Sequence, residues 1–280
     1  MLLQESIKCY QGDVLARGSS FLYIPPHRLL QPYISNYTIS FPTPQSMPDG
    51  YTVLPTASST LVISVSTDNI ISVLRGVNIK ACNVGAHANK MKLLLLVEFH
   101  PGGLYPFFRM DQWEVADSSF TLDGLDKALA QTLEDVLMAS GHVKVLVNAL
   151  DRIFIARLPE RNQRDTGVSF PGILCDIIHR HGNINARELS SEFCYSEKHV
   201  RRLFLRYVGA SPKTFSRIVR VNYALRLLQL PPQRVIADVA AEAGFFDQPH
   251  LIHDFKSICG LTPQAYIQNM SVFYNDWFKM

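Results

Sequence analysis

One segment of the C-terminal half occurs twice, and this repeat constrains the fold more than any other feature of the sequence. Residues 188–204 align with residues 238–255 at an offset of 50 before a central turn and 51 after it, because Phe246 is inserted in the second copy. Each copy has a short amphipathic segment, a tight turn, and a second segment that begins with a helix-capping residue, Ser196 or Asp247. The repeat predicts two helix-turn-helix units that arose by internal duplication.

The second helix of each unit is predicted to have one buried face and one outward face. Apolar residues four positions apart mark the buried face, Val200 with Phe204 and Leu251 with Phe255. Arginine can bind guanine and glutamine can bind adenine through paired hydrogen bonds, while isoleucine can contact a thymine methyl group. The two helices are therefore suited to read different base sequences. The outward residues are Lys198, Arg201 and Arg202 in the first copy and Gln248, Pro249, Ile252 and His253 in the second.

Basic residues dominate the segment from Ser196 to Arg226, which has eight lysines and arginines and one acid, Glu197. Such a cluster predicts a surface that faces phosphate groups, although a solvated helix face explains the charge equally well. We expect Arg220 to contact phosphate. The full set of residues expected to bind DNA adds Ser196, Arg206, Arg220 and Lys256 to the outward residues of the two helices.

A long helix is predicted to join the two units over residues 212–228. Ser211 and Pro212 are favourable residues for the cap and the first position of a helix. At 1.5 Å per residue the helix spans roughly 26 Å, which separates the two units by a distance approaching the ~34 Å of one DNA turn. A rigid connector of this kind would fix the register of the two reading helices.

Residues from about 170 to 270 resemble the DNA-binding domain of the AraC/XylS family of bacterial transcription regulators. The resemblance is carried by residues 196–204, 209–215, 220, 224–225, 244–256 and 260–266. It implies a seven-helix domain over residues 168–280, with the first unit at about 184–206, the connecting helix at 212–229 and the second unit at about 234–257. It also implies a sequence-specific DNA-binding regulator rather than an enzyme.

Two residues depart from the pattern of that family. Cys194 stands where the family has the turn glycine of the first unit, so we expect a strained turn there, at roughly 1 kcal/mol. His253 replaces a common arginine or lysine of the second reading helix. A histidine would read bases more weakly, so the second unit is expected to bind mainly through phosphates, or with mild pH sensitivity.

The N-terminal half is predicted to be a β-rich domain over residues 1–160. Residues 1–120 alternate β-forming runs with proline and glycine turns, which indicates a barrel or sandwich. Apolar residues at helical spacing predict two helices within residues 122–157, whose apolar face at Leu129, Leu133 and Val136 is either core or a dimer seam. Residues 157–167 are polar and predict a linker. The chain is thus expected to be a two-domain α+β protein.

This half resembles, more loosely, the cupin-like barrel that precedes the DNA-binding domain in the same family. The similarity rests on Leu54-Pro55, on residues 97–103 and on residues 106–108. It implies a regulatory domain that binds a small-molecule effector or dimerises. The expected partners are therefore double-stranded DNA, an effector, a second copy of the chain and RNA polymerase.

Several other classes of protein are disfavoured by the sequence. The five cysteines form no Cys-x-x-Cys pair, and His87 and His100 are isolated, so we expect no metal, cofactor or disulfide framework. A DNA-repair alkyltransferase with the same helical domain would need clustered cysteines, and a sensing module that no longer reads DNA would not need the outward arginines. No apolar run approaches the ~20 residues of a membrane span and no signal peptide is recognisable, which predicts a cytoplasmic protein.

Overall fold

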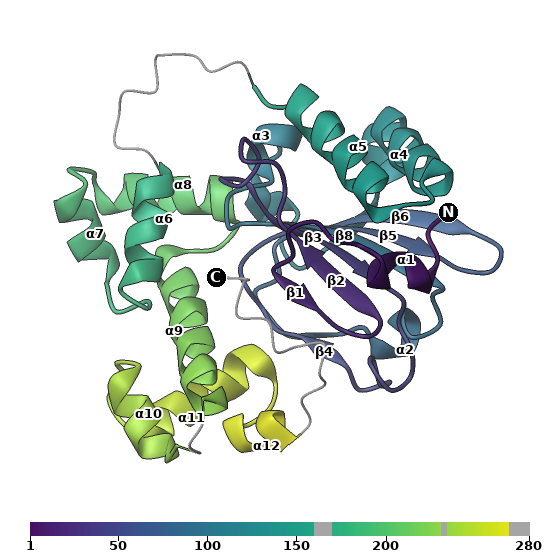
Figure 1. Cartoon of the computed structure of the whole chain (residues 1–280). Helices are drawn as coiled ribbons and strands as arrows, with labels where there is room; N and C mark the ends of the chain where they lie inside the picture. Colours follow the sequence, from purple (N-terminus) through teal and green to yellow (C-terminus); the bar gives the residue numbers. More distant parts are fainter. Residues whose placement is uncertain (160–169, 231–233, 269–280) are drawn as a thin grey trace.

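The computed structural model describes residues 1–159, 170–230 and 234–268. Its N-terminal half contains an antiparallel sheet with side chains that alternate between the two faces (Figure 1). Its strands are β1 (Ala16–Arg17), β2 (Phe21–Ile24), β3 (Ile34–Ser40), β5 (Thr60–Val65), β6 (Ile70–Arg75), β8 (Leu93–Phe99) and β9 (Ser119–Thr121). The order β1-β2-β3-β8-β5-β6-β9 leaves β1 and β9 as open edges. The two-domain α+β class is confirmed, and the sheet stays open rather than closing into a barrel.

The two faces of this sheet have different partners because successive side chains point to opposite sides of a strand. On β5, Leu61 and Ile63 are fully buried in the core beneath the helices, whereas Thr60, Val62 and Ser64 point to the other face and are half-buried. A two-stranded ribbon of β4 (Thr52–Val53) and β7 (Cys82–Asn83) lies apart from the main sheet. The face opposite the helices is thus left free to line a cavity.

Two long helices cover the first face of the sheet, α4 (Leu122–Ala139) and α5 (Val143–Ala156) (Figure 1). Leu129 and Leu133 of α4 are at most 1% exposed and pack in the same core as the sheet, and Val136 packs against that core. This apolar face is therefore core within the chain. The short helices of this half are α1 (Gln4–Lys8), α2 (Gly85–Ala88), α3 (Tyr105–Phe108) and the 3-10 helix η1 (Gln112–Glu114).

The C-terminal half is helical throughout its described residues. Its helices are α6 (Phe170–His179), α7 (Ala186–Glu192), α8 (Glu197–Val208), α9 (Pro212–Gln229), α10 (Ile236–Glu242), α11 (Gln248–Cys259) and α12 (Pro263–Gln268). Ser211 caps α9 by accepting a hydrogen bond from the Thr214 backbone N–H, and Pro212 occupies the first turn. Helix α9 runs between α6–α8 at one end and α10–α12 at the other (Figure 1). None of the helices in the described ranges is long and apolar enough to span a bilayer.

The two halves share one hydrophobic core. Leu54, Ala57 and Val77, from loops of the β domain, belong to the same buried cluster as Phe204, Phe215 and the other core residues of the helical half. Two hydrogen bonds reinforce the contact, from Asn222 Nδ2 to the Pro55 carbonyl at 2.9 Å and from the Ala81 N–H to the Ile258 carbonyl at 3.0 Å. The linker predicted at residues 157–167 lies mostly outside the described residues. The packing of these loops on the helical half thus helps to fix the orientation of the two halves.

Candidate DNA-binding surface and interdomain cavity

The turns of the two helix-turn-helix units have the same backbone geometry. Cys194 and Gly244 both adopt the left-handed region, with φ of 54° and 79°. The next residue in each turn donates a backbone hydrogen bond to the preceding helix, from Tyr195 to Ser190 and from Phe245 to Ala240, both at 2.9 Å. Glycine adopts this φ without strain, whereas a side chain disfavours it. Cys194 therefore holds the strained backbone that the sequence predicted for it.

Helix α8 carries the outward cations of the first unit. The Ser196 hydroxyl accepts a hydrogen bond from the His199 N–H at 3.2 Å and so begins the helix. Val200 and Phe204 are fully buried beneath it. On the opposite side Lys198, Arg201 and Arg202 are all exposed. The buried pair thus fixes which face of α8 is presented to solvent.

Helix α11 presents the corresponding face of the second unit. The Asp247 carboxylate accepts from the His250 N–H at 2.7 Å and caps the helix, and Leu251 and Phe255 are fully buried. Ile252 is half-buried. The exposed residues of this face are Gln248, Pro249, His253 and Lys256. This face therefore has one lysine where α8 has three cations.

Two arginines expected to bind DNA are engaged by other parts of the chain. Arg206 Nε lies 3.2 Å from Asp111 Oδ1, and its Nη2 donates to the Tyr105 hydroxyl, so it joins α8 to the β domain. Arg220 Nη2 donates to the Gly182 carbonyl at 3.0 Å, and its guanidinium lies over the Phe245 ring. Burial lowers the pKa of Arg220 below the usual value of an arginine. Arg220 is thus engaged within the domain, and the phosphate contact expected of it stays a prediction.

A buried ion pair that sequence reasoning missed joins α9 to α11. Arg217 donates from Nη2 and Nε to the two carboxylate oxygens of Asp254, at 2.8 and 3.1 Å. Asp254 is 5% exposed. Burial alone would raise the pKa of this carboxyl, but the hydrogen bonds and charge of Arg217 outweigh it and hold the pKa below its usual range. The pair fixes the second reading helix on the connecting helix.

A cavity of about 870 Å³ lies between the β sheet, the β4–β7 ribbon and helix α9. Its floor is the sheet face opposite α4 and α5, where Leu96, Val62 and Val73 stand side by side on paired strands. Val219 and Tyr223 of α9 contribute to the opposite side. An occupant of this cavity would thus touch both halves of the chain.

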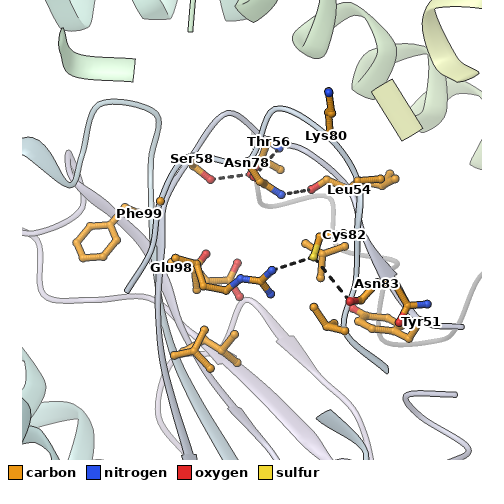
Figure 2. Close-up of a pocket in the computed structure, with 18 of the residues that line it drawn as sticks. Tyr51, Leu54, Thr56, Ser58, Asn78, Lys80, Cys82, Asn83, Glu98 and Phe99 are labelled. Carbon is orange, nitrogen blue, oxygen red and sulfur yellow. Dashed lines mark hydrogen bonds between the residues drawn. The ribbon is translucent and has the colours of Figure 1, made fainter. Parts of the chain in front are cut away.

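A polar row crosses the floor of the cavity at the end nearest the interdomain loops (Figure 2). Glu98 and Arg75 flank Thr60, because both are its partners in the sheet register. The Glu98 carboxylate accepts from the Thr38 hydroxyl at 2.8 Å, and Arg75 Nη2 lies 2.9 Å from the Cys82 sulfur. The cavity therefore combines an apolar floor with hydrogen-bonding and charged groups at one end, as ligand sites commonly do.

Comparisons with known proteins support the helix-turn-helix assignment of the helical half in particular. Residues 189–269 match the family model described as a helix-turn-helix domain, and residues 23–121 match a domain of unknown function, DUF6597. An uncharacterized HTH-type transcriptional regulator of Escherichia coli K12, YidL, is 40% identical over 74 residues, which is 26% of this chain and 25% of that protein. The HTH-type transcriptional regulator ArgR of Pseudomonas aeruginosa is 23% identical over 140 residues, 46% of this chain and 42% of that protein.

Among solved structures, a fatty-acid-bound ToxT from Vibrio cholerae covers 95% of this chain and 100% of its own, at 11% identity and a TM-score of 0.44. A probable AraC family transcriptional regulator from Rhodopseudomonas palustris is 24% identical over 34% of this chain and 91% of its own, with a TM-score of 0.30. The chain spans less than half the length of each of the three curated relatives that it matches. The duplicated units, their capped second helices and the matching family model agree: the C-terminal half of this chain contains a helix-turn-helix domain with two units, in keeping with its resemblance to the AraC/XylS regulators.

Proposed function

We propose that the chain is a sequence-specific DNA-binding transcription regulator whose helices α8 and α11 enter successive segments of the major groove. The observation that carries the proposal is the exposed set Lys198, Arg201 and Arg202 on a capped helix whose opposite face is fully buried. In a helix-turn-helix protein the second helix reads base edges from such a face. The same turn and cap recur at α11, at the far end of an 18-residue helix that spans about 27 Å.

The interdomain cavity supports control by a small-molecule effector. It is walled by the sheet of the β domain and by α9, the helix that joins the two reading units. A ligand that favours one packing of the loops on α9 would change the placement of both units, because a ligand shifts a conformational equilibrium by its difference in affinity for the two states. We also propose that the protein acts in the cytoplasm. Its proposed protein partners are a second copy of the chain and RNA polymerase.

The decisive experiment measures binding of the full chain to an operator recovered by selection from random DNA or by genome-wide mapping. Arg202→Ala should weaken binding to that operator about tenfold or more, because one bidentate contact with a base is worth about 1–3 kcal/mol. Binding of the parent should also fall steeply with salt, as phosphate neutralisation requires. A parent that binds operator and random DNA equally well would contradict the proposal.

Two control variants separate base reading from other effects of charge. Arg180→Ala removes an exposed arginine just after α6 that is paired with Asp176 and Glu192, and it should leave operator affinity unchanged. Arg220→Met should lower the stability of the domain but leave the salt dependence of the folded protein as it is. If Arg220→Met instead reduces the salt dependence of DNA binding, Arg220 does contact a phosphate.

A further inference from the structure

Phe246 is the most exposed large apolar residue among those that the structure describes, at 91%. A phenylalanine in water lacks the stabilisation that burial of its ring would provide. Single exposed apolar side chains are ordinary on protein surfaces, and exposure alone therefore assigns no role. The position of this residue within the repeat does.

Phe246 is the one residue by which the second turn exceeds the first. The left-handed residue and the hydrogen bond that follows it are the same in both turns, and each reading helix begins at its own capping residue. The insertion therefore lies between Phe245, which is buried, and Asp247, which caps α11. The backbone N–H of Phe246 donates to His250 Nδ1 at 3.3 Å, so its position is tied to the first turn of α11. The turn closes without this residue in the first unit, so its side chain serves no packing purpose in the second.

The location of Phe246 is the entrance of the second reading helix. Helix-turn-helix proteins contact base edges through the N-terminal residues of that helix, so the residue just before the cap comes close to the DNA. Its own unit is poor in charge, with Lys256 as the one lysine on the exposed face of α11 against Lys198, Arg201 and Arg202 on α8. A weakly charged reading helix needs affinity from another source, and phenylalanine can pack on the methyl group of thymine.

We propose that Phe246 is a specificity-determining DNA contact, which packs against a thymine methyl group and its sugar at the edge of the groove read by α11. This inference rests on the proposed function and adds to it the way in which the second unit selects a base. The first unit selects bases through charged hydrogen-bond donors, whereas the second selects a thymine through an apolar contact. The contact would exist only in the second unit, because the first has no equivalent residue.

The test compares three variants of the full chain on the same operator. Phe246→Ala should lower affinity about tenfold, since each 1.4 kcal/mol of lost apolar burial is a factor of ten, with an unchanged salt slope because no phosphate contact is lost. Phe246→Leu should retain most of the affinity. Val235→Ala is the matched control, because Val235 is 63% exposed and precedes α10 in the same unit, and it should have no effect. Circular dichroism melts of all variants check that they fold alike.

A second arm locates the partner base. Each thymine of the segment bound by α11 is replaced in turn by uracil, which lacks the methyl group. At one position uracil should weaken binding of the parent, and the same change should have little effect on Phe246→Ala, because the two changes remove one shared contact.

The outcomes distinguish this inference from the proposed function. If the parent prefers its operator but Phe246→Ala binds it equally well, the contact with DNA is refuted and the regulator proposal stands. If Phe246→Ala binds normally but loses activation or repression of transcription, Phe246 contacts a protein, and the inference is again overturned. A parent without preference for any operator refutes the proposed function itself.

Discussion

Replacing Arg217 with alanine should destabilise the helical half more than replacing its partner Asp254. Arg217→Ala leaves the carboxylate of Asp254, whose side chain is 6% exposed, with His250 and His253 at 3.7 and 3.5 Å and with the more distant charge of Arg220. Asp254→Ala instead leaves a guanidinium whose side chain is 30% exposed and can take up water. The two variants break the same ion pair, but the charge that remains is buried in Arg217→Ala and partly exposed to solvent in Asp254→Ala.

The expected magnitudes follow from that difference. Removing one partner of a buried ion pair costs about 3–5 kcal/mol when the remaining charge stays buried. We therefore expect about 3 kcal/mol for Arg217→Ala and about 1–2 kcal/mol for Asp254→Ala, because the partly exposed arginine is largely screened. The double variant Arg217→Met with Asp254→Leu leaves no buried charge and should be more stable than Arg217→Ala alone.

The assay is urea unfolding of the full chain, followed by the helical circular dichroism signal, at a series of pH values. The lowered pKa of Asp254 in the wild type means that its stabilising contribution is present above the carboxyl's unfolded pKa and is lost as pH falls through the folded value. In Arg217→Ala burial dominates and raises the pKa of the same carboxyl, so protonation relieves the unpaired charge. The stability difference between wild type and variant should therefore narrow as the solution becomes acidic.

Arg180→Ala provides the control, because Arg180 makes ion pairs that lie in solvent and its loss should leave the unfolding midpoint unchanged. Equal destabilisation by Arg217→Ala and Asp254→Ala would refute the reasoning from solvation. So would a stability difference that does not change with pH.

Two further predictions test the strained turn and the cavity. Cys194→Gly should raise stability by about 1 kcal/mol in urea unfolding, because glycine adopts the φ of 54° without strain, and a neutral or destabilising result would show that the thiol makes a compensating contact. Val62→Trp should fill part of the cavity floor between Leu96 and Val73 and abolish the response of transcription to the effector while operator affinity persists; an unchanged response would exclude the cavity as the effector site.

The features that the sequence predicted well are those set by local pattern. The capping roles of Ser196 and Asp247, the buried pairs of the reading helices and the connecting helix all depend on residues within a few positions of one another. The strained backbone at Cys194 was predictable because the family that the chain resembles has a glycine at this position of the turn. The pattern also indicated a β-rich N-terminal half and located its two long helices.

The features that the sequence did not predict depend on contacts between distant segments. Arg206, Arg217 and Arg220 all looked like surface cations, since nothing local reveals that Asp111, Asp254 and the Gly182 carbonyl approach them. Whether the sheet closes depends on how its first and last strands meet, which no local pattern encodes. The packing of the loops at Leu54 and Val77 on the helical half is of the same kind.

The core shared by the two halves limits how such a protein can be recombined during evolution or by design. A chimera that joins this helical half to a foreign sensor would leave an apolar patch of α9 without its covering loops, and a graft that kept only the linker would not restore it. Substitutions at Leu54, Ala57 and Val77 should accordingly be compensated by substitutions on α9. The unit that can be inherited intact is thus the helical half together with the two loops that cover it.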